Sequence, residues 1–353
     1  MMGLAAQAFW HIPGRFGLAN VFGPSYSLRC VVFHHISDNE SPFTSGMNVR
    51  ATIQEFEGAL RFLTAHYTPV RLDDVLAAPK GHQLPPRAVL VTFDDAYASV
   101  VEVAAPLCRK YGVPAVFFVN AAFLDNQCLA PDNLICYVAN VHGMEKVNAA
   151  ARSSQRNEIL QLHSLTEVFG SFLPSLTLNQ RKGFLEALVR SAGVNERQLA
   201  VEAALYLTGE QLRTLGSFDF EIGNHTYTHV HCRGLAQSEF AKEIDRNKIE
   251  LETASGVKIR SFSQPYGSSK DLTRELASHL ERSGHEAVFL SESVANPQDF
   301  DQFRLNRVNT RTDSDDWLFF DLEVLPRVRL TRNRLFRISK ATTSGQSLGS
   351  KIN

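Results

Sequence analysis

The sequence has little that would tie it to a membrane, to nucleic acid or to an oxidising compartment. None of its apolar runs reaches the roughly 18 residues that a membrane-spanning helix needs, so no transmembrane segment is expected. The formal net charge of the 353 residues is −1, which gives no reason to expect nucleic acid as a partner. The five cysteines form no C-x-x-C pair, and a chain of this length does not need a disulfide framework, which favours a reducing compartment.

The start of the chain also lacks the features of an export signal. Residues 1–10 contain neither a basic leader nor a long apolar core, so we expect a cytoplasmic protein. Apolar residues make up 44% and charged residues 21%, as in an ordinary globular protein. The length fits an α/β barrel that forms one domain.

Apolar runs at intervals along the chain predict a parallel α/β fold. Continuous apolar runs are typical of strands buried on both faces, and helical patterns between them predict parallel pairing. Seven such strands indicate a closed or nearly closed barrel. The seven candidate strands are Leu28–Phe33, Ala88–Phe93, Ala115–Val119, Phe218–Ile222, Ile259–Phe262, Glu286–Leu290 and Arg304–Val308.

Several helices are marked by capping and termination signals. Thr52-Ile-Gln-Glu55 is a capping box, followed by apolar residues at helical spacing. A second helix is expected over about 97–111, where Gly112 ends it. Two more are expected over about 238–254 and from about residue 271 to a stop at Ser283-Gly284.

One interval between strands is too long for a simple βα unit. About 100 residues separate the third and fourth strand candidates, whereas such a unit needs roughly a third of that. Segment 125–205 has helical patterns, so we interpret it as a helical insertion, either beside the active-site mouth or serving stability alone. The resulting division is an N-terminal arm (1–27), a barrel (28–124 and 206–312), the insertion (125–205) and a basic C-terminal tail (313–353).

The last part of that tail has charge of one sign. Residues 327–353 contain seven Lys and Arg but no Asp or Glu, and they close in Ser/Gly-rich sequence. We expect a solvated and partly disordered tail from Arg327 onward. Contact with an anionic polysaccharide or a membrane surface is the alternative.

Two short stretches carry side chains suited to catalysis. The strand candidate 88–93 ends in Asp94 and Asp95, and α/β barrels place their active sites at the carboxyl ends of strands. The second stretch holds His225 and His229, whose four-residue spacing puts both imidazoles on one face of a helical turn. One carboxylate and two imidazoles make a facial metal triad with positions left open for water and substrate.

A divalent ion held by Asp95, His225 and His229 would lower the pKa of its bound water towards ~7 and polarise a neighbouring carbonyl. Asp94, free of the metal, is the candidate general base for that water. Successive side chains on a strand face opposite ways, so both carboxylates serve one site only if the strand ends at them. Each stretch alone has a plainer explanation, as a helix cap or as surface histidines. Their combination after predicted strands favours a metal site.

The turn at Pro265-Tyr266-Gly267 is a candidate oxyanion site, because a turn there exposes backbone N–H groups. A donor of this kind stabilises the negative charge that develops on a carbonyl oxygen. Proline has no N–H group, so the donor is that of Tyr266 or of Gly267.

Together these motifs resemble those of the polysaccharide deacetylases of the NodB-homology group, carbohydrate esterase family four. Thr92-Phe-Asp-Asp95 matches the first family motif, T-F-D-D, and His225-Thr-Tyr-Thr-His229 matches the second, H-[S/T]-x-x-H. Ser263-Gln-Pro-Tyr-Gly267 resembles the third, but it lacks the Arg that many members carry before the Pro. The similarity covers about 28–124 and 206–310.

The resemblance implies a distorted (β/α)7, TIM-like barrel that hydrolyses N-acetyl, or sometimes O-acetyl, groups of sugars. It gives Asp94 the role of base. Asp95, His225 and His229 become ligands of Zn2+ or of another divalent ion such as Co2+, Ni2+ or Mn2+.

Two departures from the family pattern concern the acid and the missing arginine. The late family motif that carries an acid His has no match after residue 290, but the segment 31–36 resembles one that supplies this His from the first strand in one branch of the family. His34 aligns with it and is the candidate general acid; the alternative is a barrel-mouth histidine with no proton to give. Arg304 or Arg307, on the seventh strand candidate, is a candidate substitute for the missing Arg that orients the base; otherwise both are structural.

The sequence therefore predicts a metal-dependent hydrolase of linear amide C–N bonds, a deacetylase of an N-acetylated polysaccharide, oligosaccharide or glycan precursor. An O-acetyl polysaccharide esterase would need the same site with a weaker acid. A sugar-binding barrel without turnover is the third possibility, and the presence of Asp94 argues against it. The identity of the sugar and the oligomeric state do not follow from the sequence.

Overall fold

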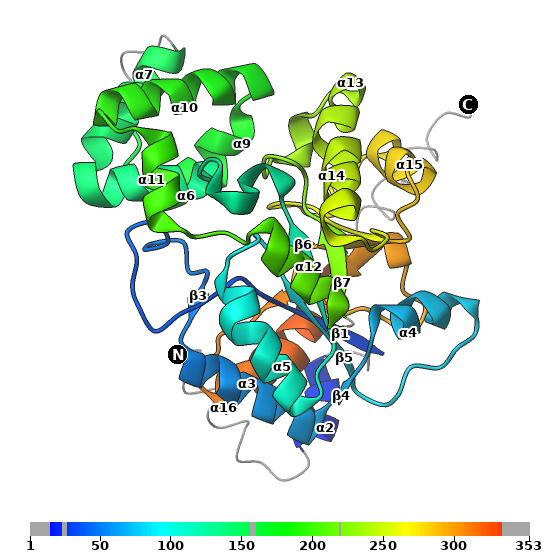
Figure 1. Ribbon diagram of the computed structural model, residues 1–353. Coiled ribbons are helices and arrows are strands. Elements are labelled where there is room, and N and C mark those ends of the chain that lie inside the picture. The colour runs from blue at the N-terminus through cyan, green and yellow to red at the C-terminus, as the bar shows by residue number, and fades with distance from the viewer. Residues whose placement is uncertain (1–14, 23–26, 156–159, 219, 334–353) are drawn as a thin grey trace, which may run out of the picture.

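A parallel β-sheet rolled into a barrel is the centre of the fold (Figure 1). The computed structural model describes residues 15–22, 27–155, 160–218 and 220–333. The strands pair in the order β10-β9-β8-β7-β6-β5-β1-β11, every pair is parallel, and a short β4 joins β5 at the side. Their bounds are β1 Leu28–Phe33, β4 Thr68–Pro69, β5 Ala88–Phe93, β6 Ala115–Val119, β7 Glu221–Asn224, β8 Ser261–Ser263, β9 Ala287–Leu290, β10 Leu305–Asn306 and β11 Val308–Asn309. A second sheet pairs β2 (His35–Ile36) with β3 (Arg50–Ala51).

The seventh predicted strand holds the two edges of the sheet together. Its first half, β10, pairs with β9, and its second half, β11, pairs with β1. The single residue between them is Arg307, whose N–H donates to the carbonyl of Leu290 at 3.0 Å. The sheet thereby returns to its first strand, and the predicted distorted (β/α)7 barrel is confirmed.

The fourth strand starts later than predicted. Phe218 does not open it but caps helix α12 (Gly209–Ser217), donating to the carbonyls of Thr214 and Leu215. The strand instead runs on to Asn224, a polar residue whose buried side-chain amide donates to the carbonyl of Ile244. A prediction that places strands at apolar runs ends this strand too early, because its last residue is polar.

Helices surround the barrel where the capping signals place them. The box at Thr52 and Glu55 opens α3 with both of its hydrogen bonds, and Gly112 and Gly256 end their helices with positive φ. Two of the predicted helices contain a π-helical turn, η3 and η8. The bounds are α3 Ile53–His66, α4 Leu72–Ala77, η3 Val100–Ala104, α5 Ala105–Tyr111, α13 Gln237–Phe240, η8 Ala241–Asp245, α14 Arg246–Ser255, α15 Arg274–Arg282, α16 Asp315–Phe319 and η10 Phe320–Val324.

The alternation of side chains along β5 determines which residue at its end faces the barrel interior. Val89, Val91 and Phe93 join a cluster with residues of α3, so this face looks towards the helices. Leu90 belongs to a second cluster with residues of β1, β6, β9 and β10, which is the barrel interior. Because side chains alternate along a strand, the inward series continues to the first residue after the strand, Asp94.

Segment 125–205 is helical, as predicted. Figure 1 shows these helices in green, gathered beside the barrel. They enclose a hydrophobic cluster of their own, which also takes in Phe43 and Tyr97 from loops of the barrel. The bounds are α6 Pro131–Tyr137, η5 Val138–His142, α7 Met144–Gln155, α8 Leu165–Glu167, η6 Val168–Phe172, α9 Leu173–Ser175, α10 Leu178–Ala192 and α11 Glu196–Ala203.

The segment after the barrel is less exposed than the sequence suggests. Residues 315–333 are helical, and Arg327 is buried with Glu323, which also pairs with Arg29 at 2.9 Å. The prediction of a solvated tail is therefore wrong at Arg327, because a buried carboxylate pairs with it. Residues 334–353 of the tail and 1–14 of the arm lie outside the described residues. Within the described ranges, no helix combines the length and hydropathy needed to cross a membrane.

Candidate active site

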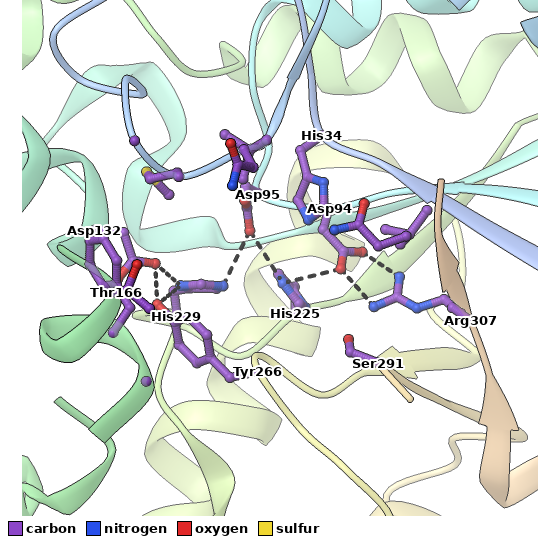
Figure 2. Close-up of a pocket in the computed structure, with 18 of the residues that line it drawn as sticks. His34, Asp94, Asp95, Asp132, Thr166, His225, His229, Tyr266, Ser291 and Arg307 are labelled. Atoms are coloured by element: carbon purple, nitrogen blue, oxygen red, sulfur yellow. Dashed lines mark hydrogen bonds and ion pairs between the residues drawn. The ribbon is translucent and has the colours of Figure 1, made fainter. Parts of the chain in front are cut away.

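A pocket of about 450 Å³ lies at the carboxyl ends of the barrel strands (Figure 2). Its lining includes six of the site residues that the sequence predicts, from four separate stretches of the chain. Residues of the helical insertion, among them Asp132, line it as well. The predicted residues in the lining are His34, Asp94, Asp95, His225, His229 and Tyr266.

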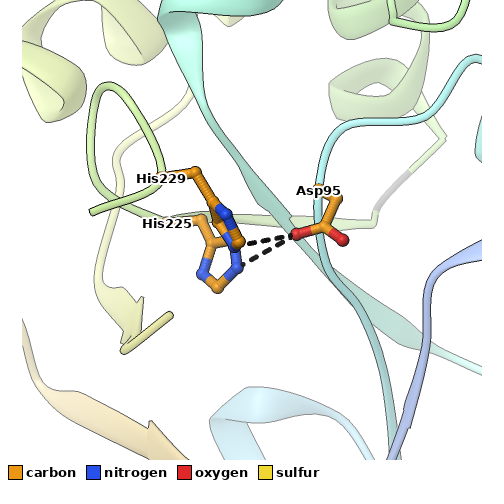
Figure 3. Close-up of side chains that lie close together, drawn as sticks. All are labelled: Asp95, His225 and His229. Atoms are coloured by element: carbon orange, nitrogen blue, oxygen red, sulfur yellow. Dashed lines mark ion pairs between the residues drawn. The ribbon is translucent and has the colours of Figure 1, made fainter. Parts of the chain in front are cut away.

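Asp95, His225 and His229 form a compact group of possible metal ligands (Figure 3). One ligand atom from each lies within 4.8 Å of the others. The Oδ1 atom of Asp95 is 3.2 Å from Nε2 of His229 and 3.4 Å from Nε2 of His225. This oxygen is buried and has no hydrogen bond of normal geometry within the described residues. A buried carboxylate oxygen that faces two imidazole nitrogens in this way fits a divalent ion.

The two histidines meet through a loop and not through the helical turn that their spacing suggests. Residues 225–231 have no helical assignment, and the left-handed φ angles of Thr226 (62°) and His229 (54°) fold the loop back. The ring centroids of the two histidines are 5.0 Å apart. Left-handed backbone at non-glycine residues is costly and gathers at functional sites.

The two carboxylates of the first motif diverge because the strand ends before them. β5 stops at Phe93, and the N–H of Asp94 still donates to the carbonyl of Phe33 at 3.0 Å. Asp95 then adopts a φ of 73°, which turns its side chain towards the histidines. This is the condition under which both carboxylates serve one site.

Each imidazole is held through the nitrogen that points away from Asp95. Nδ1 of His225 is 2.8 Å from the carbonyl oxygen of Ser263 on β8. Nδ1 of His229 is 3.0 Å from a carboxylate oxygen of Asp132 and 3.1 Å from the hydroxyl of Tyr266. Both rings therefore present Nε2 to the position that an ion would occupy.

The charges of this group shift its proton affinities in opposite directions. Burial raises the pKa of Asp95, but His229 and His225 outweigh it and hold the pKa well below its usual value. Burial lowers the pKa of His229, but the carboxylates of Asp95 and Asp132 raise it to about 10. The site thus concentrates negative charge around the imidazoles, as a cation-binding site requires.

Asp94 is held by an arginine from the opposite edge of the sheet. Nη1 and Nη2 of Arg307 each lie 2.7 Å from one of its two carboxylate oxygens, and Nη2 also donates to the hydroxyl of Ser263 at 2.8 Å. Burial raises the pKa of Asp94. The interactions with Arg307 and His225 lower it by a larger amount, so the pKa lies below its usual value and the carboxyl is ionised.

Of the two arginines considered from the sequence, Arg307 reaches Asp94 and Arg304 does not. Its side chain is fully buried beside Asp94. Arg304 lies about half-exposed, 3.7 Å from Asp301. The expected contact between an arginine of the seventh strand and Asp94 is therefore made by Arg307 and not by Arg304.

His34 follows β1 and lines the pocket with both carboxylates (Figure 2). Burial lowers its pKa more than the charges of Asp95 and Asp94 raise it. A low pKa makes a strong acid but one that is sparsely protonated. A role as general acid therefore needs a proton to reach His34 during the reaction.

The turn at Tyr266 narrows the choice of oxyanion donor. The N–H of Gly267 donates to the carbonyl of Gln264 at 3.1 Å, which closes the turn. The N–H of Tyr266, a residue with a φ of 53°, is then the candidate donor. A Cβ on Gly267 would meet the side chain of Gln264 at 2.3 Å, so the turn needs glycine there.

Two residues of the insertion contact the site, although no motif in the sequence predicts either contact. Asp132, at the start of α6, contacts His229 and Tyr266. Arg181, on α10, donates to the carbonyl oxygens of His229 at 2.8 Å and Thr228 at 3.1 Å.

Comparison with known proteins agrees with this geometry. The family model described as polysaccharide deacetylase matches residues 81–284, more than half of the chain. The chain belongs to the polysaccharide deacetylase family. The matched residues include both carboxylates and both histidines of the group described above. The resemblance drawn from the three motifs is thus confirmed, and so is the prediction of a deacetylase enzyme.

Solved structures of deacetylases share the fold of this family member. A Streptococcus pyogenes deacetylase, PplD, in complex with acetate is 14% identical with a TM-score of 0.55; the match covers 84% of this chain and 98% of that one. IcaB from Ammonifex degensii is 18% identical with a TM-score of 0.53, over 85% and 98% of the two chains. A de-N-acetylase from Aggregatibacter actinomycetemcomitans is 16% identical with a TM-score of 0.53, over 81% and 96%. At such identities the likeness establishes the fold.

Proposed function

We propose that this polysaccharide deacetylase removes N-acetyl groups from a polysaccharide, oligosaccharide or glycan precursor, with water as the nucleophile. The observation that carries the proposal is a carboxylate, Asp94, that pairs with Arg307 and lies beside the group of three possible metal ligands without belonging to it. A divalent ion, Zn2+ before Co2+, Ni2+ or Mn2+, would be held by Asp95, His225 and His229. It would supply acidification of a water molecule and polarisation of the acetyl carbonyl.

The side chains around that position divide the remaining work. Asp94 takes the proton of the attacking water, and Arg307 keeps its carboxylate in place. The N–H of Tyr266 donates to the carbonyl oxygen as it gains negative charge. His34, once it has received a proton, gives it to the departing amine, which leaves poorly as an anion.

The amide is favoured over the ester because the pocket holds a candidate acid. An alcohol leaves more readily than an amine, so an O-deacetylase needs His34 less. The fold shared with a de-N-acetylase supports the same choice. A sugar-binding barrel without turnover is disfavoured, since sugar binding does not require a buried carboxylate beside the possible metal ligands.

Acetate release separates these possibilities. The protein is treated with a chelator, reloaded with Zn2+ or Co2+, and incubated with N-acetylglucosamine oligomers and, separately, with an acetate ester. We expect acetate from the oligomers, loss of activity after chelation and recovery with metal. Turnover of the ester alone would favour the O-deacetylase, and sugar binding without turnover would favour the binding barrel. Activity that survives complete metal removal would overturn the proposal.

A further inference from the structure

One carboxylate of the insertion is buried against the metal-ligand group. Asp132 lies in the first turn of α6 and is 3% exposed. Its Oδ2 atom is 3.0 Å from Nδ1 of His229 and accepts a hydrogen bond from the hydroxyl of Tyr266. A buried carboxylate is costly unless it is paired. The pairing of Asp132 is with groups of the candidate active site, as the dashed lines of Figure 2 show.

The next residue fixes where this carboxylate stands. The side chain of Asn133 donates to the hydroxyl of Tyr97 and to the carbonyl of Phe43, both at 2.9 Å. The hydroxyl of Tyr206 donates to Asn133 at 2.5 Å. All of these groups are buried. Tyr97 lies two residues after Asp95. The hydrogen bond between Asn133 and Tyr97 therefore connects the start of α6 to the loop that carries Asp95.

The proton on Nδ1 decides whether His229 can bind a metal through Nε2. A neutral imidazole carries one proton, and a hydrogen-bond acceptor beside Nδ1 keeps it there, leaving the Nε2 lone pair free. His225 receives this support from the backbone carbonyl of Ser263. For His229, the corresponding acceptor is the carboxylate of Asp132, which also makes the imidazole a stronger ligand.

From this geometry we infer that Asp132 is a positioning residue, which fixes the tautomer and the ring orientation of His229 as a metal ligand. The inference rests on the proposed metal site. It gives the helical insertion a part in metal binding, beyond the position at the active-site mouth or the role in stability considered from the sequence. Asp132 touches neither the acetyl group nor the water in this account; it acts through His229.

Metal affinity tests the inference directly. The variant Asp132→Asn keeps the shape of the side chain but loses its charge, and its amide N–H can face Nδ1 and favour the wrong tautomer. We expect its dissociation constant for Zn2+, measured by competition with a chromogenic chelator, to rise about 10- to 100-fold. The absorption spectrum of the Co2+-loaded variant should also change, because the orientation of one ligand changes.

The matched control is Glu186→Gln, which removes an exposed carboxylate of the same insertion on α10. Its Zn2+ affinity should equal that of the parent. An Asp132→Asn protein that binds Zn2+ within twofold of the parent would overturn the inference while leaving the proposed function intact. A parent protein that binds no divalent ion would instead overturn the proposed function.

If Asp132→Asn does not fold, the parent protein still provides a test. In the Zn2+-loaded parent, NMR of ¹⁵N-labelled histidine should find a proton on Nδ1 of His229. Its resonance should lie downfield, as expected for a hydrogen bond to a carboxylate. Absence of a proton from Nδ1 would refute the positioning role.

Discussion

The two walls of the pocket are built on different principles. On the barrel wall, Asp94 and Asp95 follow β5 and His34 follows β1. Arg307 lies between β10 and β11. The pairing of these strands sets the positions of the four residues. On the insertion wall, Asp132 lies on a helix that packs over a separate hydrophobic cluster. The barrel supplies the groups proposed to meet substrate and water, whereas the insertion supports one ligand from behind. On the proposed function, we expect substitutions on the two walls to alter catalysis and metal affinity separately.

The two histidines of one motif show the same division. His225 is held by a backbone carbonyl of the barrel, which no substitution of a side chain removes. His229 is held by side chains, and its carbonyl oxygen is held by Arg181 of the insertion. A charged acceptor strengthens an imidazole ligand more than a neutral carbonyl does. Of the two histidines, the second is therefore the one that Asp132 and Arg181 of the insertion contact.

The sharpest test of the barrel wall is the variant Asp94→Asn. The amide keeps the shape of the base but cannot take a proton, so kcat for acetate release should fall about 10²- to 10⁴-fold. Metal content, measured by elemental analysis, should stay at the parental value because Asp94 is not one of the three proposed ligands. A loss of metal together with activity would mean that the two walls do not divide the work in this way.

A second test compares the two arginines of the seventh strand region. Arg307→Met leaves the buried carboxylate of Asp94 without its partner, so the free energy of unfolding should fall by about 3–5 kcal/mol. Arg304→Met removes a half-exposed pair and should change it by less than about 1 kcal/mol. Urea denaturation measures both.

Arg307→Lys refines this comparison, since it keeps the positive charge but not the two parallel hydrogen bonds. Its stability and its kcat should lie between those of the parent and of Arg307→Met. Equal stability of the Arg307 and Arg304 methionine variants would contradict the importance given to the buried pair.

The third test concerns the acid. His34→Ala should lower kcat on an N-acetylated oligomer about 10²-fold, because the amine then leaves without a proton. Turnover of an acetate ester should fall less, and Zn2+ affinity should not change. If the variant keeps full activity on the amide, His34 is a barrel-mouth histidine and not the acid.

Much of the barrel could be predicted because its strands are buried on both faces. The apolar runs at Leu28–Phe33, Ala88–Phe93 and Ala115–Val119 coincide with β1, β5 and β6. The prediction weakened where a strand ends in buried polar residues, as at Asn224. The seventh strand is divided at Arg307 because its two halves pair with different strands, β9 and β1. Pairing between distant strands leaves no pattern in the local sequence.

The candidate site was predictable where its residues belong to short motifs, and not where they reach it through the fold. Short motifs identified the carboxylates and histidines because the chemistry needs them at fixed spacing at strand ends. The choice between Arg304 and Arg307 required the register of the closed sheet. Asp132 and Arg181 reach the site through the packing of the insertion, so their positions in the sequence reveal nothing of the contact.

The smallest expected effect lies on the insertion wall, at Arg181. Its guanidinium donates to the carbonyl oxygens of Thr228 and His229, and Arg181→Met would leave both without this charged donor. Hydrogen bonds to charged groups contribute about 1.5–3 kcal/mol, but the loop keeps its other contacts, so Zn2+ affinity should fall by no more than about tenfold. The neighbouring exposed Lys182, changed to Met, is the matched control and should leave affinity unchanged. If Arg181→Met lowered kcat at saturating Zn2+ as strongly as Asp94→Asn, the insertion would take part in the chemistry itself, and the division between the walls would not hold.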